Sequence, residues 1–215
     1  MKSQREILKE MTFTKKVSHI WYYYKWIILG VLFTIGCTIS LIVSIQSQKE
    51  VVLSVAIVDS RNSDSAQFII EEMNKQLLVT EEQRVYVDTS LNMDDKINSA
   101  SVIYDSIQKF NTLVSAGDYD IVIDEGIVPQ NYTSQDVIVD LRTLMTKEQE
   151  KQWKDRFYIK EDSQGNEIVA GLFIDNLPWT EAAALNKEKP VVSVMTTALN
   201  LENARIMLQW ILTYQ

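Results

Sequence analysis

The stretch that decides the fold begins with VVLSVAIVD at Val51–Asp59 and ends with YDIVID at Tyr119–Asp124. Both runs are short and rich in β-branched apolar residues, which is typical of strands that are covered on both faces. Between them, Arg84–Thr89 (RVYVDT) is a third run of strand length. These runs predict three strands that are close together in the sequence.

Two segments with helical periodicity separate the three predicted strands. Residues 66–78 (AQFIIEEMNKQLL) carry apolar side chains three and four positions apart, and Asp64 or Ser65 is a suitable N-cap for this helix. Residues 100–114 have the same spacing, and Gly117 supplies a left-handed C-cap after them. Because each crossover between strands is helical, the order predicts an α/β fold, with a mostly parallel sheet flanked by helices.

The rest of the chain predicts a helical stretch, a hairpin, one more strand and a final helix. Residues 139–157 have a helical period, with Thr146 as an N-cap at a break. Residues 158–176 read as two strands around a polar turn that contains glycine. A valine-rich strand is expected over 190–196, and Asn200 is expected to cap the last helix.

The charges are divided unevenly along the chain. Up to Trp26 there are six basic and two acidic residues, a net charge of +4. The remainder carries 15 basic and 27 acidic residues, a net charge of −12, and the two parts sum to −8. Nucleic acid and anionic lipid surfaces repel a domain of this charge, so we expect no nucleic-acid partner.

An uncharged run, WIILGVLFTIGCTISLIVSI, extends from Trp26 to Ile45. As a helix it would be about 30 Å long, which is the thickness of a bilayer's hydrocarbon core. With the basic residues before it, the run predicts a cytoplasmic tail over 1–25, a single transmembrane helix over 26–46 and an extracellular domain over 47–215 in the cell membrane. The lipid bilayer is then a partner, and the predicted membrane-interface residues are Trp21, Tyr22, Tyr23, Tyr24, Lys25 and Trp26.

A cleaved signal peptide and a lipoprotein signal are the alternatives to this anchor. The run is longer than the about 7–15 apolar residues of a signal peptide, and no small-residue cleavage site follows it. A lipoprotein signal would attach lipid to Cys37, but Thr34 stands where such signals carry leucine. Gly36, Ser40 and Ser44 are four residues apart and predict a helix-packing face, although small residues scattered along a helix give the same pattern.

Three segments resemble parts of bacterial extracellular solute-binding proteins. In Phe110–Ile123 (FNTLVSAGDYDIVI) a helix that ends in Ala-Gly leads into a strand, and Val139–Leu144 (VDLRTL) is similar to the segment that follows that strand. Residues 190–212 resemble the strand, asparagine-capped turn and helix that pack back onto the first lobe of these proteins. The resemblance implies one lobe of a solute-binding-protein-like fold.

The chain departs from this family in its second lobe. The interval 125–189 is short, and it reads as a helical stretch and a hairpin instead of a full lobe. A single lobe offers the edge of a cleft but cannot close around a ligand. We therefore expect an interaction module, an accessory subunit of a membrane complex such as an ABC transporter or a sensor. The alternative is a receptor that binds a small solute or peptide for an ABC transporter.

Residues suited to catalysis or metal binding are few. The only histidine, His19, and the only cysteine, Cys37, both precede the acidic domain, which argues there against Ser-His-Asp, Cys-His and zinc sites. The six glycines are dispersed, so the sequence contains no phosphate-binding or dinucleotide-binding loop. We expect a domain that is not an enzyme and that holds no cofactor or metal.

A few polar and aromatic residues are candidates for binding a partner. Asp124 and Glu125 follow a predicted strand, at the end of the sheet where α/β proteins bind ligands. Trp179, beside Pro178 on a predicted loop, would suit an interface if it were exposed. The alternatives are a solvated surface for the two acids and the core for Trp179. The acidic loop around Asp94 lacks the ligand spacing of a calcium-binding loop.

Overall fold

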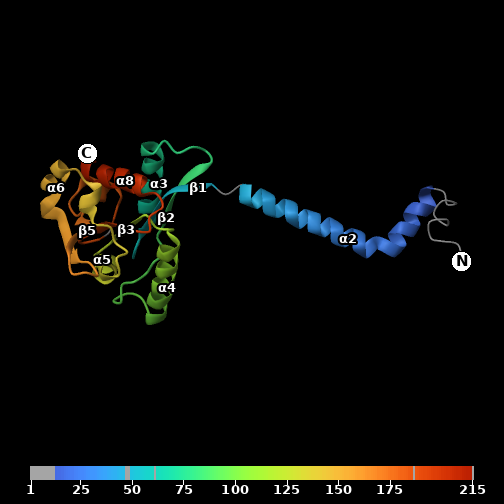
Figure 1. Cartoon of the computed structure of the whole chain (residues 1–215), viewed down its shortest axis with the longest axis horizontal. Coiled ribbons are helices and arrows are strands. Elements are labelled where there is room, and N and C mark those ends of the chain that lie inside the picture. The colour runs from blue at the N-terminus through green and yellow to red at the C-terminus, as the bar shows by residue number, and fades with distance from the viewer. Residues whose placement is uncertain (1–12, 47–48, 61, 186, 215) are drawn as a thin grey trace. The chain divides into compact units, whose positions relative to one another are not determined.

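The computed structural model describes residues 13–46, 49–60, 62–185 and 187–214. The chain divides into two compact units, Met1–Gln48 and Lys49–Gln215 (Figure 1). The first unit contains the long helix α2 (Phe13–Gln46), and the second contains an α/β domain. Each unit is described by itself below.

The predicted transmembrane helix is contradicted. Within the described residues, no helix combines the length and the apolar character needed to cross a membrane. The predicted single-pass topology and extracellular localisation depended on this span, so they are contradicted as well. Residues 1–12 of the predicted cytoplasmic tail lie outside the described residues.

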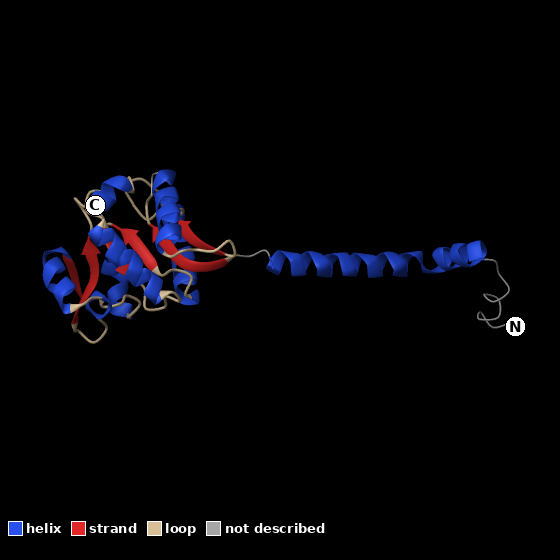
Figure 2. Ribbon diagram, turned by 90° about the horizontal axis from the view of Figure 1, so that it is seen from above, coloured by secondary structure: helices blue, strands red, loops and turns tan. Residues whose placement is uncertain are grey.

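The domain contains one six-stranded sheet with the strand order β2-β1-β3-β6-β5-β4. Figure 2 shows the strands running through the domain with helices packed around them. The strands are β1 (Glu50–Ile57), β2 (Gln83–Asp88), β3 (Ile121–Asp124), β4 (Phe157–Glu161), β5 (Glu167–Phe173) and β6 (Val191–Val194).

The sheet is mixed, and the predicted mostly parallel sheet is therefore wrong. β1 pairs in parallel with β2 and with β3, as helical crossovers require. β6 pairs antiparallel with β3, β5 with β6, and β4 with β5. The physical reason is that the second half of the chain reaches the sheet through a hairpin and loops, which allow antiparallel neighbours, instead of through further helical crossovers.

Helices cover both faces of the sheet. α3 (Ser63–Gln76) begins after the N-cap Asn62, which accepts from the Asp64 amide, so the expected caps Asp64 and Ser65 lie inside the helix. In the predicted helical stretch 139–157, Thr146 forms a capping box with Gln149. The others are α4 (Ala100–Ala116), α5 (Ile127–Tyr132), α6 (Lys147–Trp153), α7 (Pro178–Ala182) and α8 (Leu201–Thr213), with 3₁₀ turns at Thr133–Gln135, Leu141–Leu144 and Lys154–Arg156.

Two apolar clusters fill the two faces. Because side chains alternate along a strand, Leu53, Val55 and Ile57 of β1 belong to one cluster and Ala56 belongs to the other. The first cluster contains residues of α3, α7 and α8, and the second contains residues of α4 and α5. In Figure 1, α3 and α8 accordingly lie on one side of the sheet and α4 and α5 on the other.

The end of α4 lies close to the segment that precedes α8. Gly117 is the left-handed C-cap of α4, with a φ of 77°, which confirms the sequence prediction. A Cβ atom on Gly117 would lie 2.8 Å from the carbonyl oxygen of Thr197 and 3.2 Å from Cγ of Leu199. Glycine is therefore required here both by the backbone conformation and by the close approach of the next segment.

Candidate functional site

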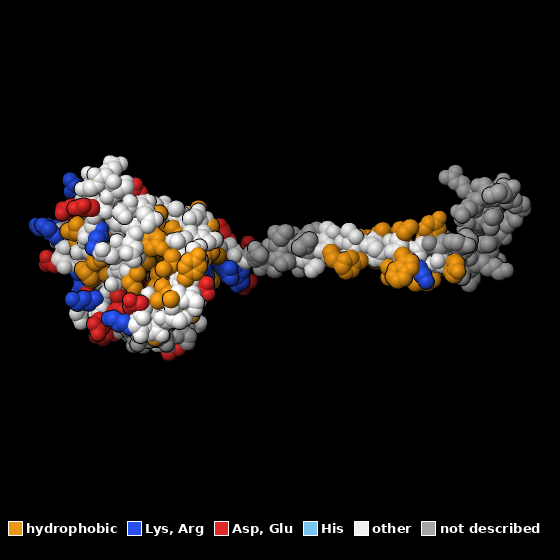
Figure 3. All heavy atoms as spheres, turned by 90° about the horizontal axis from the view of Figure 1, so that it is seen from below, with side chains coloured by type: hydrophobic (Ala, Val, Ile, Leu, Met, Phe, Trp, Pro, Cys, Tyr) orange, Lys and Arg blue, Asp and Glu red, His pale blue; other side chains and the backbone are white. Residues whose placement is uncertain are grey.

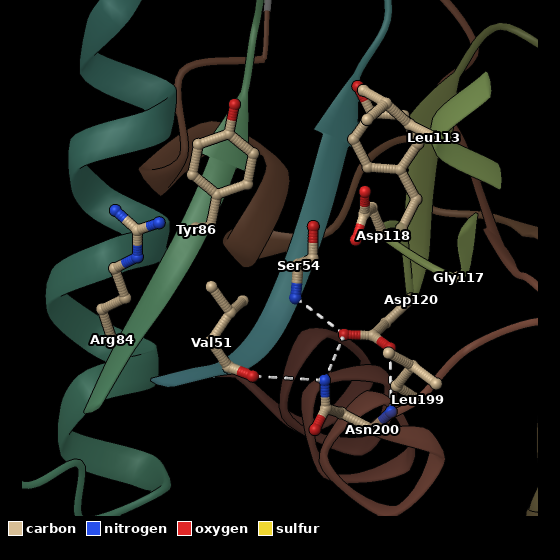
Figure 4. A pocket seen from close by; sticks show the side chains of 11 residues that line it. Val51, Ser54, Arg84, Tyr86, Leu113, Gly117, Asp118, Asp120, Leu199 and Asn200 are labelled. Carbon is tan, nitrogen blue, oxygen red and sulfur yellow. Dashed lines mark hydrogen bonds between the residues drawn. The ribbon is translucent and has the colours of Figure 1, made fainter. Parts of the chain in front are cut away.

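The candidate site is a pocket of about 290 Å³ in the α/β domain. Its walls come from the first halves of β1 and β2, the end of α4, the residues that lead into β3, and the residues before α8 (Figure 4). These elements meet because β1, β2 and β3 are parallel, while β6 runs in the opposite direction and brings its own end to the same edge. The pocket therefore lies at the amino-terminal ends of the parallel strands.

Asp120 forms the floor of the pocket and joins three of its walls. Its carboxylate accepts hydrogen bonds from the Ser54 amide at 2.8 Å, from the Asn200 amide at 2.9 Å and from Asn200 Nδ2 at 3.1 Å. The residue is fully buried, and its own amide donates to the Ser54 carbonyl. Asp120 thus ties the start of α8 to β1 and fixes the geometry of the pocket.

Ser54 carries a buried hydroxyl that has no hydrogen-bond partner in the described part of the chain. The residue is 3% exposed, and its Oγ makes no hydrogen bond among the described residues, although its backbone groups are both paired with Asp120. Figure 4 shows the hydroxyl directed between Tyr86 and Asp118. A buried polar atom without a partner costs about 1–3 kcal/mol, so this hydroxyl favours any occupant that can bond to it.

The rim of the pocket carries both apolar and charged side chains. Leu199 is 75% exposed and Tyr86 is 38% exposed, and both line the pocket. The Arg84 guanidinium lies 5.7 Å from the centre of the Tyr86 ring, and Asp118 is exposed across the pocket. In Figure 3, hydrophobic side chains gather on one face of this domain, with charged side chains around them.

The carboxyl-terminal ends of the same strands, where α/β proteins usually bind ligands, are filled. Asp59 after β1 accepts from the Met93 amide at 2.6 Å and from the Asp94 amide at 3.0 Å. The cavity beside Asp59 measures only about 10 Å³. The Asp59 carboxylate therefore holds the loop at Met93 and Asp94 in place.

Asp124 at the end of β3 is also engaged. Its carboxylate accepts from the Gly126 amide at 2.9 Å and the Val128 amide at 2.6 Å, which holds the start of α5. Asp124 is 1% exposed, so it does not offer the surface that the sequence prediction required. Glu125 is exposed, and its Oε1 accepts from the Glu188 amide at 2.8 Å.

Trp179 is a core residue. It lies in α7 and is fully buried, where an exposed loop position would be needed for an interface. Its ring centre lies 5.6 Å from that of Trp210 and 6.3 Å from that of Phe68, both at edge-to-face angles. The physical reason is that α7 packs onto the sheet beside α8 and buries its aromatic residue there.

The residues predicted for the membrane interface and for helix packing lie in α2. Trp21, Tyr22, Tyr24, Lys25 and Trp26 are exposed, whereas the side chain of Tyr23 lies outside the described part. Gly36 and Ser40 are exposed and so is Cys37, whereas the side chain of Ser44 lies outside that part. None of these residues is among those that line the pocket.

Tyr119, which lines the pocket, belongs to an ionic cluster around the buried Asp88. Asp88 accepts from the Tyr119 hydroxyl at 2.5 Å and pairs with Lys109 Nζ at 2.7 Å. Burial raises the pKa of Asp88, but the bonds from Lys109, Ser90 and Tyr119 outweigh it and lower the pKa to about 2. Burial and the neighbouring Asp88 carboxylate raise the pKa of Tyr119. Asp88 is therefore ionised and Tyr119 neutral near pH 7, and the cluster links α4 to the sheet.

The rest of the domain offers weaker candidates for a functional site. A more open concavity of about 560 Å³ lies between the 3₁₀ turn at Lys154–Arg156 and β5. Its Arg156 already donates to the carbonyl oxygens of Phe173 and Asp175, at 3.1 and 2.9 Å. Within the described residues, no group of three or more histidine, cysteine or acidic side chains could hold a metal ion.

The stability of the domain is expected to fall between about pH 4 and pH 6 through Asp124. Burial raises the pKa of Asp124 to about 6, although hydrogen bonds from Val128 and Gly126 oppose the rise. In the unfolded chain the pKa is about 3.9. The contribution of Asp124 is therefore fully present below about pH 4 and is lost as the pH rises through 6, by up to about 3 kcal/mol.

Urea unfolding of the wild type and of Asp124→Asn at pH 4, 5, 6 and 7 measures this effect. We expect the decline in the free energy of unfolding to be smaller in the variant, because asparagine does not titrate. Asp88 has the opposite effect on the pH dependence of stability, because its pKa is lowered. Its contribution is present above about pH 4 and is lost as the pH falls toward 2. An equal decline between pH 4 and 6 in both proteins would contradict the assignment to Asp124.

The residues of the pocket were not predicted to form a site, although Gly117 and Asn200 were expected as helix caps. Ser54 is a lone polar residue within the apolar run of β1, and this was the one local signal that pointed to it. Tyr86 and Leu199 carried no signal, because exposure of an apolar side chain depends on which elements cover it.

Comparison with known proteins provides no family for this chain. No family model matches it, and no curated protein and no solved structure is significantly similar to it. The resemblance of its segments to solute-binding proteins stays a prediction.

Proposed function

We propose that the domain Lys49–Gln215 is a non-enzymatic interaction module that binds a partner protein at the pocket. The observation that carries this proposal is Leu199, which is 75% exposed on the rim. Its side chain lies next to Gly117, at the end of α4. An exposed apolar residue beside a pocket is typical of a protein interface.

The size and lining of the pocket support a protein partner over a free solute. A volume of about 290 Å³ is at the lower end of the about 300–1,000 Å³ of small-molecule sites. It suits one inserted side chain, with the exposed apolar residues around it excluding water. Leu201, 41% exposed at the start of α8, extends the apolar surface beyond the pocket.

The proposal is tested by placing a photoreactive amino acid at Leu199 in the full chain and irradiating the cells that naturally make it. We expect one covalent adduct, whose partner also co-purifies with the wild-type chain. Leu199→Asp is expected to reduce this co-purification about tenfold or more, because a charge at the centre of an apolar contact removes about 2 kcal/mol of binding energy.

Ile159→Asp is the matched control. Ile159 is an exposed apolar residue on β4, at the other edge of the sheet from the pocket. The change in chemistry is the same, and partner binding should be retained. Equal retention in the two variants, or equal loss, would overturn the proposal, and thermal unfolding of both variants establishes that they are folded.

The solute receptor remains the alternative function. It predicts a ligand-dependent rise in melting temperature of the full chain without any protein partner. The resemblance to solute-binding proteins makes a transporter or sensor subunit the first partner to examine in the experiment above.

A further inference from the structure

We propose that the pocket takes a lysine side chain of the partner protein. This inference rests on the proposed function and assigns the chemistry of the inserted residue. It follows from three features of the pocket: its apolar walls, its unpaired buried hydroxyl and its excess of carboxylates.

The walls suit the methylene chain of a lysine. Leu113 and Leu199 line one side and Tyr86 lines the other, so that four methylene groups can be covered by apolar surface. Lysine commonly buries its stem in this way while its ammonium group seeks polar partners. A pocket of about 290 Å³ accommodates one side chain of this size.

The inner end of the pocket suits an ammonium group. Ser54 Oγ has no hydrogen-bond partner among the described residues and can accept a bond, and the exposed Asp118 carboxylate lines the same pocket. Asp120 accepts bonds from amide groups, which leave its negative charge in place. An ammonium group would make a charge-assisted bond to the hydroxyl and a favourable interaction with both carboxylates.

The balance of charge favours a cation despite the presence of Arg84. The pocket lining contains two carboxylates, Asp118 and Asp120, and one guanidinium, that of Arg84. The net charge of the lining is therefore −1. Arg84 lies over the Tyr86 ring and not at the inner end of the pocket. The net charge of −12 after Trp26 attracts basic partners over a longer range. Because three N–H groups already bond to Asp120, the Ser54 hydroxyl and the Asp118 carboxylate remain as bonding partners, and they fit the compact ammonium of lysine better than the planar fork of arginine.

The inference is tested by nuclear magnetic resonance on the full chain, with Nα-acetyl-lysine amide as the probe. We expect the amide signals of Ser54 and Gly117 to shift and to saturate with a dissociation constant in the millimolar range, which is on the order of 4 kcal/mol of binding. Nα-acetyl-norleucine amide, which has the stem without the charge, should bind about fivefold or more weakly.

Two variants locate the binding. Asp118→Asn should weaken binding of the lysine probe about fivefold, and Ser54→Ala should also weaken it. Asp105→Asn removes a carboxylate from an exposed position of α4 outside the pocket lining, and it should leave the affinity unchanged. Equal binding of the norleucine and lysine probes, or no effect of Asp118→Asn, would overturn the inference.

The outcomes separate this inference from the proposed function. If the lysine probe fails while Leu199→Asp still abolishes partner binding, the module binds its partner through a different residue type. Saturation by free 1,5-diaminopentane at a concentration far below that of the lysine probe would indicate a small amine as the natural occupant, and would overturn the assignment to a protein side chain.

Discussion

Replacing Trp179 with alanine is expected to lower the free energy of unfolding of the domain by about 3–5 kcal/mol. Trp179 is among the largest fully buried side chains, and its ring contacts Phe68 and Trp210 at edge-to-face angles. Alanine would leave a cavity between α3, α7 and α8 that these neighbours cannot fill without moving. Since a domain is typically stable by only about 5–15 kcal/mol, this is a large part of its stability.

Urea unfolding at pH 7 measures the change, with two variants for comparison. Tyr104→Ala removes an exposed aromatic ring from α4 and should change stability by about 0.5 kcal/mol or less. Trp179→Phe keeps an aromatic ring and removes a buried Nε1 that has no partner among the described residues, so it should cost much less than alanine. A loss for Trp179→Ala no larger than that for Tyr104→Ala would show that Trp179 is not in the core.

Replacing Asp120 with alanine is expected to cost about 3 kcal/mol or more. The carboxylate is the acceptor for the Ser54 amide, the Asn200 amide and Asn200 Nδ2, and all three donors would lose it. Hydrogen bonds to a charged group contribute about 1.5–3 kcal/mol each, and buried donors without a partner add a penalty. The start of α8 should detach from β1 before the rest of the domain unfolds.

Hydrogen exchange together with urea unfolding measures this effect. The amides of Ser54 and Asn200 should lose protection in Asp120→Ala more than amides elsewhere in the sheet. Asp118→Ala, an exposed neighbour two positions away, should change stability by about 0.5 kcal/mol or less. The prediction is wrong if both variants show the same stability, or if protection is lost evenly over the domain.

Several elements of this fold were predictable because they depend on local sequence. The three parallel strands, the helices between them and the C-cap at Gly117 follow from apolar spacing and from the conformational freedom of glycine. The hairpin of β4 and β5 forms around a glycine turn, as predicted. The capping box at Thr146 is a local pattern of the same kind.

The errors concern properties that depend on distant parts of the chain. The prediction of a mostly parallel sheet failed at β6, since the direction of a strand depends on where its connection enters the sheet. Burial likewise depends on distant residues: backbone amides of α5 enclose Asp124, and Trp179, for which the core was the alternative to an interface, packs against α8. The predicted membrane span depended on the length of an apolar run, and the described helix does not meet that requirement.

The sequence by itself determined the order of the six strands, the cap at Gly117 and the acidic character of the domain, because each is encoded within a few neighbouring residues or in the composition. Only the tertiary structure decided which side chains meet at the pocket. Asp120 joins Ser54, 66 residues away, to Asn200, 80 residues away, and Leu199 is exposed because no element in the described ranges covers it. Burial and exposure are properties of the packed chain, so a binding site made of distant residues emerges only when the sheet and its helices are assembled.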